Sequence, residues 1–386
     1  MDVLEYVGKD LLREAGLRVP DGSVVAHVAD TEVLGEALLG RCVVKAQIAA
    51  GKRGKGGGIV FAGGADEVRV AVSSLLGSTL NGHLVERVLI EAAVPIAHEY
   101  YAAIMNDAST GLPLVLFSAD GGIEIEDVAH DRIARTTVDV RTGLSEDAAR
   151  ALVSAAGAGR DDATALTRVL LALYSVYDAN DAELLEINPL VRADSGEFYA
   201  LDCKLVLDDS AKRRQEELFD KAATALGPQG TELERRARSV GLLYMELDGD
   251  VGVLANGAGL TMTTMDAVAH YGGRAANFME IGGEAYTKAT PALEIVLANP
   301  RVRSLLVNFC GAFAQTDVMA RGVVDAMKAL KPVIPVAFSI HGTGEEAAIA
   351  IVRDELGIEP YDSMDDAVQF VIAAAASASP IAGAAR

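Results

Sequence analysis

The strongest constraint on the fold is a regular alternation of apolar strands and helices after residue 240. Strand-like segments at 251–257, 275–281, 304–310 and 332–340 are each followed by a segment with helical spacing, and a last helix is expected at 364–376. This rhythm predicts a parallel, doubly wound sheet with helices on both faces. Ligands of such sheets bind beyond the carboxyl ends of the strands, and here those ends carry glycine-rich turns.

The first 207 residues lack this rhythm. A helix is expected at 3–15, where apolar residues recur at helical spacing, and two more at about 145–157 and 161–178. Most of the other segments read as strands, and the last two, 184–192 and 197–207, predict a hairpin. This half of the chain is therefore expected to be mixed, with no repeated strand–helix–strand unit.

A highly charged segment at 208–240 separates the two halves. Its pattern is helical and a Gly-Pro pair interrupts it at 227–228, so we interpret it as a helical connector. We therefore expect one domain at 1–235 with two subdomains, a second at 241–378, and a flexible tail at 379–386.

The overall charge restricts the class of partner. The net charge is −21, which argues against nucleic acid and anionic membrane surfaces, since both favour a basic face. No apolar run reaches the roughly 18–20 residues of a membrane span, and the N-terminus has no signal-peptide pattern. Three widely spaced cysteines without a CxxC pair are typical of a reducing compartment. A cytoplasmic protein is expected.

A basic, glycine-rich loop, AAGKRGKGGGIV, spans residues 49–60. It is not a Walker A loop, because Lys55 is followed by Gly56 and because predicted strands, 42–48 and 57–62, flank it on both sides. One interpretation is a β-hairpin over phosphates, with backbone N–H groups and cations that neutralise phosphate oxygens. The alternative is a solvated surface hairpin.

Oxygen-bearing side chains are grouped further along the chain. Glu186 and Asn188 are two residues apart in a predicted strand, so they share a face, and Asp202 lies on the strand that pairs with it. A carboxylate and a carboxamide oxygen suit Mg²⁺, which keeps several waters; a solvated strand face is the other interpretation. Lys45, on the strand entering the glycine-rich loop, either reaches phosphates or extends to water from the edge of the core.

These motifs, in this order, resemble an ATP-grasp domain. To about residue 375, the chain resembles the β-subunit family of succinyl-CoA synthetase (succinate–CoA ligase, ADP- or GDP-forming). The resemblance implies an N-terminal ATP-grasp domain followed by a flavodoxin-like CoA-ligase domain. It is carried by VVKAQIAAGKRGKGGG, GGIEIEDVA (121–129), LEINPL, ALDCKL, and ANGAGLTMTTMD followed by GG-x-x-ANF.

The resemblance implies a heteromeric acid–CoA ligase. A partner α subunit would bind CoA and carry a histidine that is phosphorylated in turn, and this chain would exchange phosphoryl between Mg²⁺-bound ATP or GTP and that histidine. None of the six histidines here sits in the Gly-His-Ala-Gly setting of the phosphorylated residue, which agrees with an acceptor on the partner. The choice of ATP or GTP, the αβ or α₂β₂ assembly and the carboxylic acid stay open.

The resemblance also implies roles for individual residues. Those that would hold the nucleotide phosphates are Lys45, Lys52, Arg53 and Gly54. Those that would line the nucleoside pocket are Glu91, Val94 and Glu99. Those that would bind Mg²⁺ are Asn188 and Asp202. Two would act in catalysis, Lys45 on the phosphates and Glu186 by orienting the phosphohistidine. Those that would approach the carboxylic acid are Asn256, Gly311, Ala312 and Phe313.

Several positions depart from the family pattern, among them Phe313, which stands where the family usually has isoleucine. Lys52 stands at a usual glycine of the loop, and Glu284 and Ala312 replace glycines on the acid side. A carboxylate at 284 would repel a dicarboxylate, and a Cβ at 312 would narrow the space for the acid. Other short acids such as malate, or a non-catalytic nucleotide-binding paralogue, are therefore alternatives. An ATP-grasp carboxylate–amine ligase is a third alternative, against which the doubly wound second half argues.

Overall fold

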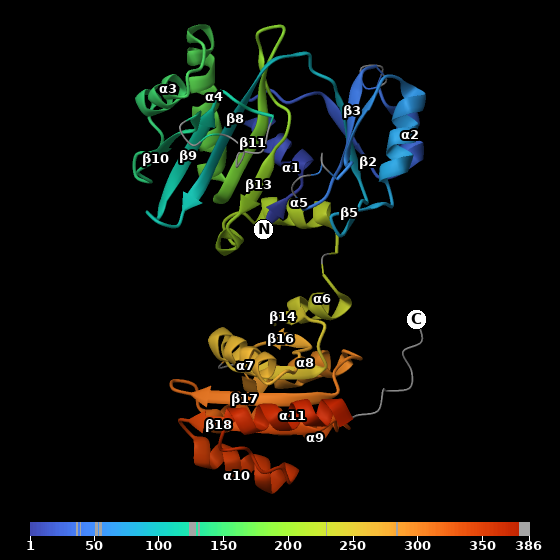
Figure 1. The fold of residues 1–386 in the computed structure, drawn as a ribbon, viewed down its shortest axis with the longest axis vertical. Helices are drawn as coiled ribbons and strands as arrows, with labels where there is room; N and C mark the ends of the chain where they lie inside the picture. Colours follow the sequence, from blue (N-terminus) through green and yellow to red (C-terminus); the bar gives the residue numbers. More distant parts are fainter. Residues whose placement is uncertain are drawn as a thin grey trace. The chain divides into compact units, whose positions relative to one another are not determined.

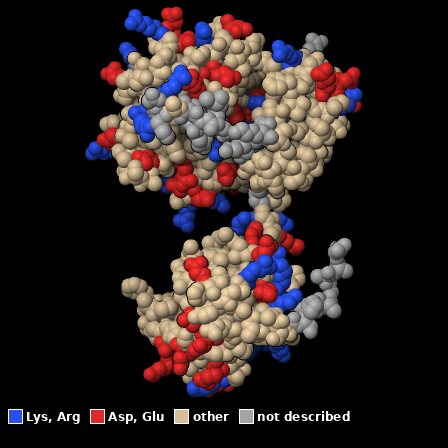
Figure 2. Space-filling model, in the orientation of Figure 1, with Lys and Arg blue, Asp and Glu red and all other residues tan. Residues whose placement is uncertain are grey.

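The computed structural model describes residues 1–35, 38, 40–50, 53, 56–122, 129, 132–228, 230–282 and 285–377, without the side chains of residues 285 and 286. The chain forms two compact units, Met1–Gly227 and Pro228–Arg386, and the division falls within the charged segment at 208–240 (Figure 1). None of the helices in the described ranges is long and apolar enough to cross a membrane. Acidic and basic atoms are spread over the visible face of both units (Figure 2).

The first unit contains a large antiparallel sheet with strand order β1-β13-β11-β8-β9-β10, and β12 pairs with β11 at one end. Its strands are β1 Asp2–Val3, β8 Ile96–Asp107, β9 Leu112–Ser118, β10 Ala134–Thr137, β11 Ala182–Ala193, β12 Phe198–Ala200 and β13 Lys204–Leu207. The helices that accompany it are α1 Glu5–Glu14, α3 Glu146–Ala155, α4 Arg160–Ala179 and α5 Glu216–Leu226. The sequence predicts α1, α3 and α4 to within two residues at either end.

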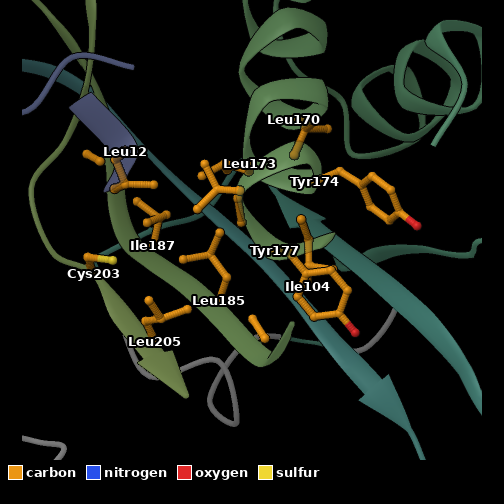
Figure 3. Close-up of a cluster of buried hydrophobic side chains, with 14 of the residues drawn as sticks. Leu12, Ile104, Leu170, Leu173, Tyr174, Tyr177, Leu185, Ile187, Cys203 and Leu205 are labelled. Atoms are coloured by element: carbon orange, nitrogen blue, oxygen red, sulfur yellow. The ribbon is translucent and has the colours of Figure 1, made fainter. Parts of the chain in front are cut away.

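The core of this sheet forms where α4 packs on β11 and β8 (Figure 3). On α4, Leu170, Leu173 and Tyr177 recur at helical spacing and are buried, so they form one apolar stripe. On β11, Leu185 and Ile187 alternate with more exposed residues and face the core. Burying a side chain of this size stabilises the fold by about 1.5–3 kcal/mol.

A smaller antiparallel sheet, with strand order β2-β7-β3-β4, completes the first unit. Its elements are β2 Gly22–Val25, β3 Cys42–Ala46, β4 Ile59–Ala62, β7 Val88–Ala92 and the helix α2 Ala65–Leu75, with the 3₁₀ helix Val28–Val33 and the short pair β5 Thr79–Leu80 and β6 His83–Leu84 beside them. The predicted strands flanking the glycine-rich loop are therefore confirmed as the β3–β4 hairpin, although β3 ends two residues earlier than predicted.

In the second unit, β15 Val251–Ala255, β17 Ser304–Gly311 and β18 Val336–Gly342 are parallel, as predicted. Single parallel bridges place β16 Asn277–Met279 beside β15. The other edge of β16 pairs antiparallel with β14 Tyr244–Glu246, a strand that the sequence does not predict. The helices are α6 Glu232–Ser239, α7 Ala258–His270, α8 Ala285–Ala298, α9 Thr316–Leu330, α10 Glu345–Leu356 and α11 Met364–Ser377.

Both faces of this sheet are covered, which confirms the doubly wound arrangement. Leu305 and Val307 of β17 pack in one apolar cluster with residues of α8, α9 and α10. Leu306, between them, packs in another cluster with residues of α7 and α11. Successive side chains of a strand point to opposite faces, so one buried strand serves two apolar layers.

The predicted strand at 332–340 begins too early. The chain enters β18 only at Val336, and Val333 is fully exposed. Pro332 and Pro335 lack the N–H groups that a sheet ladder needs, which explains the late start.

Close backbone contacts tie the carboxyl ends of β17 and β18 together. Gly342 has a φ of +95°, and a Cβ there would overlap the carbonyl oxygen of Gly311. Thr343 N also donates a hydrogen bond to Gly311 O at 3.1 Å. This turn therefore requires glycine both for its backbone conformation and for space.

We predict that Gly342→Ala lowers the free energy of unfolding of the second unit by more than about 2 kcal/mol, because alanine disfavours the left-handed region and meets the Gly311 backbone. Gly259→Ala in the first turn of α7 is the matched control. A Cβ there meets nothing within 4 Å, so the change is expected to be neutral or stabilising by up to about 1 kcal/mol. Urea unfolding of the full chain measures both, and equal stability of the two variants would contradict the prediction.

Candidate functional site

The β3–β4 hairpin carries the cations that the sequence assigns to phosphate. Lys45 is on β3, and Arg53 lies in the connecting loop, where its carbonyl accepts a hydrogen bond from Gly58 N at 2.8 Å. Lys52 and Gly54, predicted to hold phosphate as well, lie outside the described residues. The loop connects two antiparallel strands, β3 and β4, whereas a Walker A loop connects a strand and a helix. This confirms the predicted difference.

Both cations are engaged by carboxylates. Lys45 Nζ lies 2.9 Å from Glu5 Oε1 and 2.7 Å from Glu91 Oε2. Arg53 pairs with Glu5 Oε2 and with Asp202 Oδ1, both at 2.7 Å.

A third cation, Lys9, lies 2.7 Å from Glu5 Oε1 and 2.6 Å from Glu91 Oε1. We refer to the six side chains as the buried ion cluster: Glu5, Lys9, Lys45, Arg53, Glu91 and Asp202. Asp202, with 36% of its side chain exposed, is the member that reaches solvent most. The cluster therefore contains three cations and three carboxylates, largely shielded from water.

Helix α1 reaches the cluster through a close contact with the segment at 201–203. A Cβ on Gly8 would lie 2.7 Å from Cys203 Sγ, so glycine lets the helix approach this segment. The Leu201 carbonyl accepts hydrogen bonds from the amines of Lys9 and Lys45. The predicted strand at 197–207 is wrong here: β12 ends at Ala200 and β13 begins at Lys204, and between them the Leu201 carbonyl and the Asp202 carboxylate contact cations of the cluster.

The electrostatics favour the charged forms of Glu5, Lys45 and Arg53. Burial alone would raise the pKa of the Glu5 carboxyl, but Lys45, Lys9 and Arg53 together hold it well below its usual range. Burial opposes the charge on Lys45 and Arg53 as well, yet the neighbouring carboxylates raise the pKa of both. Removal of one partner from such a group leaves an uncompensated buried charge, which typically costs about 3–5 kcal/mol.

The predicted magnesium ligands lie opposite one another, Asn188 on β11 and Asp202 in the segment between β12 and β13. Leu190 pairs with Ala200 and Glu186 with Lys204, and this register places Asn188 opposite Asp202. Both side chains have partners in the protein: Gly122 N donates to Asn188 Oδ1 at 2.9 Å, and Asp202 Oδ1 pairs with Arg53 and accepts from Cys203 N.

Oxygen donors of this kind fit Mg²⁺, which takes one or two protein ligands and completes its shell with water and phosphate. Within the described ranges, no group of three or more His, Cys, Asp or Glu side chains is arranged to hold a metal ion. The fit therefore rests on one carboxylate and one carboxamide.

Glu186 shares the partly exposed face of β11 with Asn188, and Ile187 between them is buried, as the strand period predicts. Tyr101 OH donates a hydrogen bond to Glu186 Oε2 at 3.2 Å. Tyr101 is buried on β8, the strand that pairs with β11, so this contact holds the Glu186 side chain against the neighbouring strand.

The three residues predicted for the nucleoside pocket separate in the structure. Glu91 is a member of the buried ion cluster. Val94 is partly exposed in the segment between β7 and β8, and Glu99 lies on β8 with its side chain against Gly122. The pocket itself stays a prediction.

The residues predicted for the acid site lie in the second unit, at the ends of β15 and β17. Asn256 makes two hydrogen bonds with the backbone of Cys310: its Nδ2 donates to Cys310 O at 2.9 Å and its Oδ1 accepts from Cys310 N at 2.8 Å. Gly311 is buried, whereas Ala312 and Phe313 are exposed. Glu284 lies outside the described residues.

The sequence does not single out Glu5, Lys9, Gln47 or Tyr101. Gln47 lies beside the cluster and donates from Nε2 to Glu5 Oε2 at 3.3 Å. One signal was available: Glu5 and Lys9 are four residues apart in a helix of which most other inward positions are apolar. Nothing local identifies their partners, since Glu91 is 82 residues from Lys9.

Comparisons with known proteins cover most of the chain. Residues 2–192 match the ATP-grasp domain family and residues 254–373 match the CoA-ligase family. A succinate–CoA ligase [ADP-forming] subunit beta of Rubrobacter xylanophilus is 40% identical over 359 residues, which are 92% of this chain and 93% of that protein. The subunit of the same name from Anaeromyxobacter sp. (strain K) is 39% identical and covers 98% of this chain and 100% of its own length.

A solved structure of similar fold is the ATP citrate lyase of Methanothrix soehngenii in complex with citrate and coenzyme A. The TM-score is 0.76, and the match covers 96% of this chain and 99% of that chain. The two sequences are 22% identical, so this likeness bears on the fold alone.

We predict that Glu5 makes the first unit sensitive to acid. The pKa of its carboxyl is lower in the folded state than the ordinary value of 4.5, so the unfolded chain takes up the proton first. Its contribution to stability is therefore full above about pH 4.5 and is lost as the pH falls towards the folded-state pKa, by up to about 1.4 kcal/mol per pH unit.

Urea unfolding from about pH 6 down to about pH 3 measures this slope. Glu5→Gln should reduce both the slope and the stability at neutral pH. Glu14→Gln, which changes an exposed glutamate of the same helix, should keep the wild-type slope. An unchanged slope in Glu5→Gln would show that the acid sensitivity has another origin.

Proposed function

The chain belongs to the family of succinate–CoA ligase β subunits, and we propose that it is the nucleotide-binding β subunit of a heteromeric acid–CoA ligase. The observation that carries this proposal is the position of Lys45 and Arg53 beside the Asn188–Asp202 pair. Cations next to oxygen donors for Mg²⁺ suit phosphoryl transfer, which depends mainly on positioning and charge neutralisation.

In this proposal, Lys45 and Arg53 exchange their carboxylate partners for oxygens of the nucleotide phosphates, and Lys52 and Gly54 of the same loop add to the phosphate site. Asn188 and Asp202 hold Mg²⁺, which when bound neutralises phosphate charge. The Asp202 carboxylate, which pairs with Arg53 in the structure, is then free for the metal as Arg53 turns to the phosphates.

Glu186 is proposed to orient the phosphohistidine of the partner. Its contact with Tyr101 holds the carboxylate on the same strand face as Asn188, so a histidine that hydrogen-bonds to Glu186 would lie on the face that carries this metal ligand. Val94 and Glu99 are proposed to line the nucleoside pocket. For Glu91 we propose a different role from the predicted one, since its carboxylate pairs with Lys9 and Lys45.

The partner is proposed to be an α subunit that binds CoA and carries the phosphorylated histidine, in a cytoplasmic αβ or α₂β₂ complex. Asn256, Gly311, Ala312 and Phe313 would approach the acid at the strand ends of the second unit. The relatives' names favour succinate and ATP as substrates. The exposed Ala312 and Phe313, at positions that depart from the usual glycine and isoleucine, favour a different short acid as the second candidate.

The reaction is tested with the complex. Co-expression with a succinate–CoA ligase α subunit from the same genome is expected to yield a stable complex that releases phosphate from ATP only when CoA and a short carboxylic acid are both present. A screen of succinate, malate and related acids then ranks kcat/KM. A complex that binds nucleotide but turns over none of these acids would contradict the proposed catalysis and leave a non-catalytic paralogue.

The metal assignment is tested by binding. We expect Asn188→Ala and Asp202→Asn to weaken the affinity for Mg·ADP at least tenfold, about 1.4 kcal/mol. The first change removes the carboxamide oxygen from Mg²⁺, and the second removes the negative charge of the other ligand. Isothermal titration calorimetry with and without Mg²⁺ measures the loss. Asp66→Asn removes an exposed carboxylate from the first unit and serves as the control. Wild-type affinity in Asn188→Ala, which leaves the Arg53 ion pair intact, would refute the assignment.

A further inference from the structure

We propose that Lys9 is a positioning residue for the nucleotide site: it stays on Glu5 and Glu91 and neutralises them while Lys45 and Arg53 leave these carboxylates for phosphate. The inference rests on the proposed function and extends it to helix α1, which the nucleotide need not touch. It follows from the geometry of the buried ion cluster.

The contacts of Lys9 use its full donor capacity within the protein. Its ammonium group has three N–H donors, and it lies within hydrogen-bond distance of Glu5, Glu91 and the Leu201 carbonyl, the last at 2.8 Å. Only 2% of its side chain is exposed, compared with 9% for both Lys45 and Arg53. Lys9 is therefore the deepest of the three cations, and it belongs to a helix rather than to the hairpin.

The partners overlap in a way that permits exchange. Among the described residues, Glu5 has three cationic partners, Lys9, Lys45 and Arg53, and Glu91 has two, Lys9 and Lys45. When Lys45 and Arg53 turn to an anionic ligand, Lys9 still bridges both glutamates. Without Lys9, two buried carboxylates would face the ligand with no counter-ion, which is strongly unfavourable.

The charge of Lys9 also explains how Lys45 and Arg53 can leave the carboxylates when a ligand binds. Lys9 stays between the two glutamates and neutralises part of their negative charge. Their electrostatic attraction for Lys45 is therefore weaker than that of two carboxylates without Lys9. The cost of releasing Lys45 and Arg53 is thereby reduced. The nucleotide affinity of the folded protein should depend on Lys9, although Lys9 makes no contact with nucleotide.

A purely architectural role is the competing explanation. The cluster joins α1 and the 201–203 segment to β3 and β7, so its loss would also lower stability. The two explanations differ in what they predict for charge-compensated variants. If Lys9 has only an architectural role, its variants are less stable but their folded fraction binds nucleotide with normal affinity. If Lys9 is a positioning residue, the affinity falls when its charge is removed and recovers when a carboxylate charge is removed as well.

The test measures binding of Mg·ADP to the full-length chain by calorimetry, with circular dichroism and urea unfolding to quantify the folded fraction. We expect Lys9→Met to weaken binding at least about tenfold and Lys9→Arg to stay within about threefold of wild type. The double variant Glu5→Gln/Lys9→Met, which removes one charge of each sign, should also recover to within about threefold. Lys221→Met, which breaks an exposed ion pair with Asp10 on the outside of α1, is the matched control.

The outcomes separate this inference from the proposed function. If the wild-type chain binds no Mg·ADP, the proposed function fails and the inference fails with it. If the wild type binds and folded Lys9→Met binds equally well, only the inference is overturned. If Lys9→Met does not fold, the double variant decides: affinity near wild type supports charge balance, and a loss of more than tenfold in the folded double variant overturns it.

Discussion

The buried ion cluster is the interaction on which the first unit depends. Its members come from helix α1, strand β3, the hairpin loop, strand β7 and the 201–203 segment, so the small sheet, the large sheet and the first helix meet through charge. Apolar contacts tolerate small displacements, but a buried charge that loses its partner is costly. The cluster therefore couples the positions of elements that belong to different sheets.

This coupling has a consequence for binding. In the proposed function, Lys45 and Arg53 bind phosphate. Without a ligand these buried cations need counter-charges, which Glu5, Glu91 and Asp202 supply. In that proposal, a ligand competes with these carboxylates for the cations, which favours polyanions over singly charged molecules. Asp202 takes part in both states of the proposed cycle, on Arg53 before binding and on Mg²⁺ afterwards, and its greater exposure fits that dual role.

The second unit is organised differently, by backbone contacts rather than by buried charge. Asn256 makes two hydrogen bonds with the Cys310 backbone. The ends of β17 and β18 are in close backbone contact through Gly311, Gly342 and Thr343. These contacts fix the edge at which a parallel sheet binds ligands. Ala312 and Phe313 are exposed at this edge, so in the proposed function a change at either position would alter the choice of acid without disturbing the sheet.

The sequence by itself determined what depends on local periodicity. Apolar spacing located most helices and strands of both units, the alternation after residue 240 predicted the parallel sheet, and the two-residue period placed Glu186 and Asn188 on one face. Only the tertiary structure decided the partners of Glu5 and Lys9, the break at 201–203 and the pairing of β14 with β16. The reason is physical: periodicity is read along the chain, whereas ion pairs and sheet edges depend on contacts between residues that are far apart in sequence.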